Sequence, residues 1–138
     1  MNVLMKDGYY TAGMAEFDGH GWKEYVTICV SGGKIITVEY NAYNRSGFIK
    51  SWDMDYMRSM NGRDGTYPNE YTRIYAGRLL RDQGTERIDG IAGATASYHS
   101  FVRLADAATE NARTGRTAVS LVPLAETGEA ADNPEGRR

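Results

Sequence analysis

The chain has 138 residues, of which 41% are hydrophobic and 25% are charged, and this length and composition predict one globular domain. Sixteen basic and eighteen acidic residues give a formal net charge of −2, so overall charge gives no reason to expect binding to nucleic acid or to a membrane surface. A single cysteine excludes an internal disulfide, and with two histidines it argues against a metal site of several cysteine or histidine ligands.

The first 43 residues show the alternation of hydrophobic and polar side chains that predicts β-strands. The expected strands cover residues 8–17, 22–30 and 35–42. One face of the second strand carries Val26, Ile28 and Val30. One face of the third strand carries Ile36, Val38 and Tyr40. Gly32 and Gly33 predict a hairpin turn, because paired glycines adopt positive φ angles without strain. This region is therefore expected to form an antiparallel meander.

After residue 47, hydrophobic residues recur at the spacing of an α-helix. The expected helices cover residues 50–60, 68–83 and 97–113. The hydrophobic stripe of the first helix, which is usually buried in such helices, contains Trp52, Tyr56, Met57 and Met60. Gly84 and Gly115 are expected to end the second and third helices. A polar loop at 61–67 and a short extended piece at 86–89 are expected before the second and third helices.

These elements predict an α+β fold, in which an early antiparallel sheet packs with about three helices around a single core. Residues 1–115 are the expected domain. Residues 116–138 are expected to add a short edge segment at 119–124 and then a disordered C-terminal tail, because the composition after Pro123 has no hydrophobic period.

A turn of small residues stands directly before the third expected helix: Asp89-Gly90-Ile91-Ala92-Gly93-Ala94-Thr95-Ala96-Ser97. Glycine backbone can approach a ligand closely, and the start of a helix presents N–H groups and a positive dipole end to an anion. Thr95 and Ser97 add hydroxyl groups there. In a purely structural interpretation, Ser97 or Thr95 caps the helix, and Gly90 and Gly93 only make the turn. The segment by itself leaves both interpretations open.

This segment resembles the flavinylation motif of the FMN-binding domain family, which includes small membrane-anchored lipoproteins and flavinylated subunits of sodium-translocating quinone reductases. The motif reads Asp, two residues, Ser or Thr, Gly-Ala-Thr, any residue, and Ser or Thr. Ala92 stands where the motif has Ser or Thr, which removes one hydroxyl from the turn. The similarity extends over roughly residues 6–113. Further segments that resemble the family are Lys6–Ala12, Gly21–Lys23, Val26–Ile28, Gly33–Ile35 and Phe101–Ala105.

The resemblance implies that the Thr95 hydroxyl is esterified to the phosphate of FMN by a separate flavin transferase, which uses FAD and a divalent metal. No base is evident beside Thr95 in the sequence, which favours modification by another enzyme over self-catalysis. Asp89 is expected to fix the turn or to be recognised by the transferase. The expected cofactor-binding residues are Asp89, Gly90, Ala92, Gly93, Ala94, Thr95, Ser97, Trp22 and His20.

Residues outside the motif have both a functional and a structural interpretation. Trp22 either stacks on the flavin ring or belongs to the core. His20, in the same loop, either lies near the flavin or is an ordinary surface residue. Cys29 is expected to be a small buried hydrophobe. The remaining candidates for contact with FMN are Met14, Tyr40, residues 41–50 and His99. For each of them a role in the core, in a loop or on the surface is at least as well supported.

No Ser-His-Asp or Cys-His catalytic set is visible, so the chain is expected to be an FMN-binding electron carrier rather than an enzyme with its own substrate. Its expected partners are the flavin transferase and either redox partner proteins or a quinone-linked membrane complex, and not nucleic acid. Two alternatives stay open. One is a reductase that holds FMN without a covalent bond, and the other is a cofactor-free surface or binding module.

The location has two opposing indications. The family resemblance implies an extracytoplasmic, membrane-associated protein. Residues 1–6 do not have the pattern of a signal peptide, and no hydrophobic run approaches the ~20 residues of a membrane-spanning helix. Two possibilities therefore stay open: that the protein is cytoplasmic, or that a leader was removed or is missing from this sequence.

Overall fold

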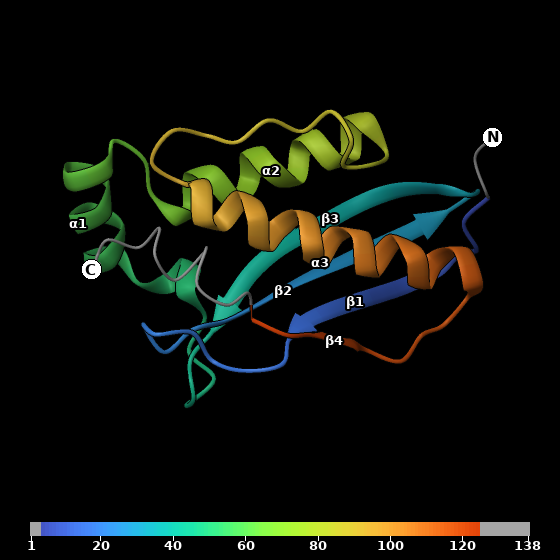
Figure 1. Cartoon of the computed structure of the whole chain (residues 1–138), viewed down its shortest axis with the longest axis horizontal. Helices are drawn as coiled ribbons and strands as arrows, with labels where there is room; N and C mark the ends of the chain where they lie inside the picture. Colours follow the sequence, from blue (N-terminus) through green and yellow to red (C-terminus); the bar gives the residue numbers. More distant parts are fainter. Residues whose placement is uncertain (1–3, 125–138) are drawn as a thin grey trace.

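A computed structural model describes residues 4–124 and shows a four-stranded sheet with helices packed on one of its faces (Figure 1). The strands lie in the order β3-β2-β1-β4. Their bounds are β1 (Gly8–Met14), β2 (Lys23–Ser31), β3 (Lys34–Tyr43) and β4 (Ser120–Val122). The first three strands pair antiparallel, whereas β4 pairs parallel to β1. The sheet is therefore mostly antiparallel, and the predicted α+β fold with a single core is confirmed.

Three helices follow the meander: α1 (Met54–Asp64), α2 (Pro68–Asp82) and α3 (Thr95–Thr114), with a short 3-10 helix, η1 (Lys50–Trp52), before α1. Helices α2 and α3 lie side by side over the sheet, and α1 lies at the end where β3 finishes and α3 begins (Figure 1). None of the helices in residues 4–124 is long and apolar enough to cross a membrane.

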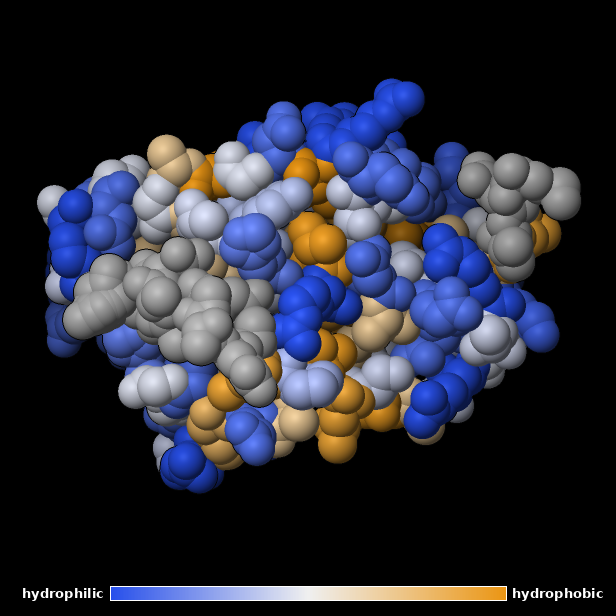
Figure 2. Space-filling view, viewed as in Figure 1, coloured by the Kyte–Doolittle hydropathy of each residue, from blue (hydrophilic) through white to orange (hydrophobic). Residues whose placement is uncertain are grey.

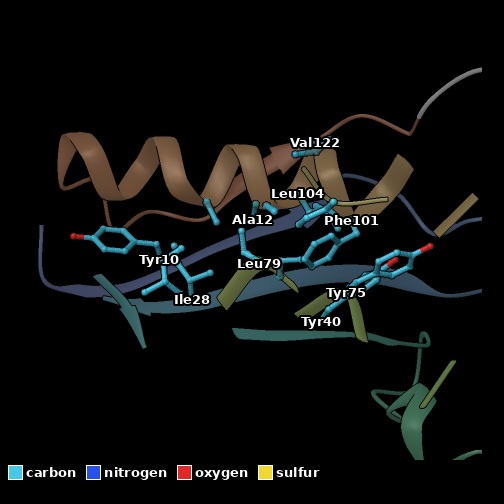
Figure 3. Packing of buried hydrophobic residues seen from close by; sticks show 14 of the residues in the cluster. Tyr10, Ala12, Ile28, Tyr40, Tyr75, Leu79, Phe101, Leu104 and Val122 are labelled. Atoms are coloured by element: carbon cyan, nitrogen blue, oxygen red, sulfur yellow. The ribbon is translucent and has the colours of Figure 1, made fainter. Parts of the chain in front are cut away.

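The core lies between α3, α2 and the inner face of the sheet (Figure 3). Val26, Ile28 and Val30 are buried, as their alternation along β2 predicts. Phe101 of α3 stacks on Tyr75 of α2, with 5.6 Å between the ring centroids. Large aromatic side chains therefore fill the space between the helices and the sheet, where they contribute much of the buried area.

The C-terminal segment of the described chain is part of this core. Val122 of β4 is buried, and β4 packs against α3 as well as pairing with β1. Val119 and Leu121 are exposed, and Figure 2 shows hydrophobic residues on this face of the molecule where β4 lies. The expected edge segment thus forms strand β4, while the tail expected after it falls, from residue 125 on, outside the described residues.

The prediction for the third strand was wrong at Ile36. Cys29 pairs with Thr37 and Val30 with Ile35, so Ile36 is an extra residue in a β-bulge. The bulge turns Ile36 outward, where it is 50% exposed, and places Ile35 in the core at 2% exposure. After the bulge, the alternation resumes and Tyr40 is buried as expected.

The first helical region also differs from the prediction, because the helix begins four residues later than expected. The Asp53 carboxylate accepts a hydrogen bond from the Tyr56 N–H and caps α1, so Trp52 lies before the helix. Trp52 is 60% exposed rather than buried, whereas Met57 and Met60 are buried as the stripe predicts. Helix α1 then continues through Asp64, into the expected loop.

The ends of the other two helices show smaller differences. Helix α2 ends at Asp82, and the residue that stops it is Gln83, in a left-handed conformation with φ 61°, rather than Gly84. The Gln83 side chain accepts a hydrogen bond from the Ile35 N–H at 2.8 Å and donates one to the Ile35 carbonyl at 3.0 Å. Gln83 therefore satisfies the backbone beside the bulge. Gly115 ends α3 as predicted. Residues 86–87 form a turn, so the prediction of an extended piece was wrong for these two residues.

Because of the bulge, substitutions of two neighbouring isoleucines should lower the free energy of unfolding by different amounts. Ile35→Ala should lower the free energy of unfolding by about 2–5 kcal/mol, because it leaves a cavity in the core. Ile36→Ala should cost less than about 1 kcal/mol, since half of its side chain is already in water. Urea denaturation of the two variants measures both values. A larger loss for Ile36→Ala would mean that the third strand has the regular register and no bulge.

Candidate functional site

The small-residue turn lies between α2 and α3 and leads directly into the first turn of α3 (Figure 1). The Ala94 N–H donates to the Ile91 carbonyl at 2.9 Å, which closes the turn. The Tyr98 N–H then donates to the Ala94 carbonyl at 3.0 Å, and this is the first hydrogen bond of the helix. The helix therefore begins at Thr95, two residues before the predicted start.

The start of α3 has no side-chain cap. Ala94 occupies the N-cap position, so the interpretation in which Ser97 or Thr95 caps the helix was wrong. Within residues 4–124, the N–H groups of Thr95, Ala96 and Ser97 make no hydrogen bond. Thr95 is exposed and occupies the first helical position. An exposed hydroxyl thus stands at the positive end of a 20-residue helix, beside donors that an anion can satisfy.

The buried side chain of Tyr75, on α2, holds the turn in place. The Tyr75 hydroxyl donates a hydrogen bond to the Ala94 carbonyl at 3.0 Å and accepts one from the Ile91 N–H at 2.9 Å. Burial raises the pKa of Tyr75, although the hydrogen bond from Ile91 opposes that rise, so the hydroxyl stays protonated. Arg78, also on α2, donates to the Asp89 carbonyl at 2.8 Å. Helix α2 therefore fixes both ends of the turn.

Gly93 is required by its contact with α1. Its φ is +85°, and a Cβ at this position would lie 2.5 Å from the Asp64 carbonyl oxygen. Gly93 therefore makes possible a close approach between two parts of the backbone. A Cβ on Gly90 would meet the Tyr98 ring at an ordinary contact distance of 3.4 Å.

A cluster of polar side chains, which we call the Lys50 cluster, lies against the first turn of α3 and contains Lys50, Glu24, Tyr40 and Tyr71; Glu24 is half-buried and the other three are buried. The Tyr40 hydroxyl lies 2.8 Å from Glu24 Oε1 and 3.1 Å from the Ser97 carbonyl oxygen, both of which accept hydrogen bonds. Burial raises the pKa of Tyr71, while the charge of Lys50 lowers it. The cluster is therefore in direct contact with the first turn of α3.

Lys50 is only 8% exposed, which is unusual for a lysine. Its ammonium lies 5.6 Å from the centroid of the Trp22 ring and 5.3 Å from that of Tyr56. Burial acts to lower the pKa of Lys50, but Tyr71, Tyr56, Glu24 and Asp18 together raise it above its ordinary value, so the side chain carries its charge.

A small cavity adjoins the cluster, with a volume of about 10 Å³, on the scale of one water molecule. The residues that line it are Glu24, Tyr40, Asn41, Ala42, Lys50, Pro68, Asn69, Tyr71 and Thr72. They come from β2, β3, η1 and α2, which meet at the end of the molecule where α3 begins (Figure 1). Within residues 4–124, no group of three or more His, Cys, Asp or Glu side chains is placed to hold a metal ion.

The other predicted residues lie at several places. Trp22 is buried in contact with Lys50 and Tyr56, whereas His20 is exposed in a turn whose N–H groups bond to the Asp18 carboxylate. Cys29 is half-buried, not buried as expected, because it points to the sheet face opposite Val30. Met14 is buried, His99 is exposed, and Asn41 donates to the Ser51 hydroxyl at 3.2 Å.

Comparison with known proteins places the chain in a family. No family model matches it. The 15 kDa lipoprotein of Treponema pallidum (strain Nichols) is 38% identical over 109 residues, which cover 79% of this chain and 77% of that protein. The chain belongs to the same family as this lipoprotein.

Two solved structures have a similar fold. The crystal structure of the CPE2226 protein from Clostridium perfringens superposes with a TM-score of 0.84 at 39% identity, covering 88% of this chain and 100% of that chain. A solution NMR structure of a protein from Clostridium thermocellum has a TM-score of 0.55 at 28% identity, and covers 78% of this chain and 92% of the other. The α+β arrangement is therefore shared with related proteins of known structure.

Two residues that define the site were not singled out by the sequence analysis. Lys50 was included only in the loop at 41–50, and Tyr75 only within the second expected helix, at 68–83. A lysine followed at once by a hydrophobic helical stripe is a weak signal for a buried charge, since most lysines are exposed. No signal in the sequence pairs Tyr75 with residues 91–94, because that contact depends on how α2 packs against the turn.

Alanine substitutions at two glycines with the same φ distinguish the cost of backbone strain from the cost of a steric clash. Gly93 and Gly47 both have φ +85°, but a Cβ on Gly47 would meet nothing within 4 Å. Gly47→Ala should cost about 1–2 kcal/mol of stability from the left-handed conformation alone. Gly93→Ala should cost a further ~1–3 kcal/mol, because the Asp64 carbonyl must move. Thermal or urea unfolding measures both, and equal losses would contradict the close contact between the turn and α1.

Removing the Tyr75 hydroxyl should loosen the turn selectively. Tyr75→Phe leaves the Ile91 N–H and the Ala94 carbonyl without this partner, which should cost about 1–3 kcal/mol. Tyr9→Phe is the matched control, since Tyr9 is 72% exposed. Hydrogen exchange should show faster exchange at Ile91 in Tyr75→Phe only. Unchanged exchange and stability in that variant would show that the hydroxyl does not hold the turn.

Proposed function

We propose that this chain is an FMN-carrying electron-transfer domain, with the FMN phosphate esterified to the Thr95 hydroxyl. The observation that supports it most directly is the position of Thr95, exposed at the first residue of α3 beside three N–H groups that have no hydrogen-bond partner within the described residues. These donors suit an anionic phosphate. When bound, the flavin ring supplies the redox chemistry.

The chemistry of attachment fits an acceptor that is presented to another enzyme. The Thr95 oxygen attacks the flavin-side phosphorus of FAD, the pyrophosphate bond breaks, AMP leaves, and the hydroxyl proton is released. The product is a phosphodiester with one negative charge, which the start of α3 stabilises. Within residues 4–124, the Thr95 hydroxyl has no hydrogen bond to a base that would activate it. A separate flavin transferase therefore fits better than self-modification.

The departure from the motif at Ala92 is compatible with this function. Ala92 is exposed, and the turn is closed by the Ala94 N–H and held by Tyr75 without any side chain from position 92. A hydroxyl at Ala92 is thus not needed to shape the turn around Thr95. We expect the acceptor to keep its position despite this substitution.

The size of the cavity favours a carrier over an enzyme with an enclosed active site. Pockets that enclose a ligand usually measure about 300–1,000 Å³, against about 10 Å³ for the cavity under the first turn of α3. A flavin ring tethered to Thr95 would therefore remain near the surface, within reach of redox partner proteins or of a quinone-linked membrane complex. Surface exposure suits the exchange of electrons between proteins.

We also propose that the protein acts outside the cytoplasm and is associated with the membrane. The support is the relative from Treponema pallidum, which is described as a lipoprotein. Covalent attachment suits such a location, since a cofactor released there is lost by diffusion.

The test is flavin fluorescence of the denatured protein on a gel after coexpression with a flavin transferase. Wild type should give a fluorescent band and Thr95→Ala a dark one, because the acceptor oxygen is gone. Thr114→Ala, which removes an exposed threonine at the other end of the same helix, should stay fluorescent.

The other outcomes assign different functions. A yellow native protein that loses its colour on denaturation would indicate non-covalent FMN, as in a reductase. A colourless protein under both conditions would indicate a cofactor-free binding module. Fluorescence that persists in denatured Thr95→Ala would contradict Thr95 as the acceptor.

A further inference from the structure

The Lys50 cluster contains a charge that the described structure does not balance by direct contact. Lys50 is buried, yet within residues 4–124 its ammonium makes no hydrogen bond and no ion pair within 4.0 Å. Its contacts are instead the faces of the Trp22 and Tyr56 rings. The carboxylates of Glu24 and Asp18 stabilise the ammonium through their charge, without an ion pair, so the field of Lys50 is only partly cancelled in its surroundings.

The cluster is connected to the site of the proposed attachment. Tyr40 lines the same cavity as Lys50 and donates a hydrogen bond to the carbonyl of Ser97, two residues after Thr95. The three unpaired N–H groups of α3 lie in that same turn. The positive end of the helix and the Lys50 ammonium therefore both make the electrostatic potential around the first turn of α3 more positive. Two separate features make this end of the molecule attractive to negative charge.

We propose that Lys50 sets the reduction potential of the flavin carried at Thr95, acting through its charge rather than as a catalytic residue. This inference rests on the proposed function. A reduced flavin carries more negative charge than an oxidised one, so a fixed cation nearby stabilises the reduced form and raises the potential. Because Lys50 is buried, water screens its charge less than it screens the charge of an exposed lysine.

Glu24 has the opposite influence. Its carboxylate belongs to the same cluster, accepts a hydrogen bond from Tyr40 and lines the cavity with Lys50. A negative charge at this place partly offsets the field of Lys50 and disfavours the reduced flavin. The two residues therefore predict changes of opposite sign when each is neutralised, which a role in packing alone does not predict.

The experiment measures the midpoint potential of the covalently flavinylated protein by spectroelectrochemistry. Lys50→Met should make reduction at least about tenfold less favourable, which is about 30 mV for a two-electron couple. Lys50→Arg should remain close to wild type, because it keeps the charge. Lys34→Met removes an exposed lysine at the start of β3, the opposite end of that strand from the cluster, and should not change the potential.

Glu24→Gln provides the independent variant should Lys50→Met fail to fold, and it should raise the potential. An unchanged potential in Lys50→Met, or in Glu24→Gln, would overturn the inference, as would shifts of the same sign in both. Attachment is scored separately, by flavin fluorescence of each denatured variant. A dark wild-type band contradicts the proposed function, whereas a fluorescent band with an unchanged potential contradicts only the role of Lys50.

Discussion

The pair of hydrogen bonds made by the Tyr75 hydroxyl, to the Ala94 carbonyl and from the Ile91 N–H, is the interaction on which the site depends. It joins α2 to the turn that precedes α3, while the Tyr75 ring stacks on Phe101 of α3 itself. The start of α3 is therefore positioned by the core rather than by a capping side chain. Because the first turn has no cap, its N–H groups remain available, and Thr95 stands at the surface among them.

The sheet and helices were largely predictable because their patterns are local. Alternation along β2 correctly placed Val26, Ile28 and Val30 in the core, and Gly115 correctly ended α3. Errors arose where a distant contact changed the local pattern. The bulge at Ile36 is accompanied by two hydrogen bonds between Ile35 and the side chain of Gln83, 48 residues away, and no spacing in the sequence predicts that pairing.

The site was predictable in part, because the proposed acceptor, Thr95, lies in a contiguous motif. The motif located Thr95 and the start of the helix to within two residues. It gave no sign of the contact between Gly93 and α1, where the missing side chain makes room for the Asp64 carbonyl. The Lys50 cluster could not be foreseen, since its members come from β2, β3, η1 and α2 and meet only in the folded chain. A charge buried beside an uncapped helix start is a property of the tertiary structure.

The central claim is that one side chain, Thr95, carries FMN, and mass spectrometry of tryptic peptides tests it most directly. Cleavage after Arg87 and Arg103 releases residues 88–103, which contain Thr95 together with Ser97 and Ser100. After coexpression with a flavin transferase, this peptide should gain the mass of FMN less one water, and fragmentation should place the addition on Thr95. An unmodified peptide, or an addition on Ser97 or Ser100, would contradict the account.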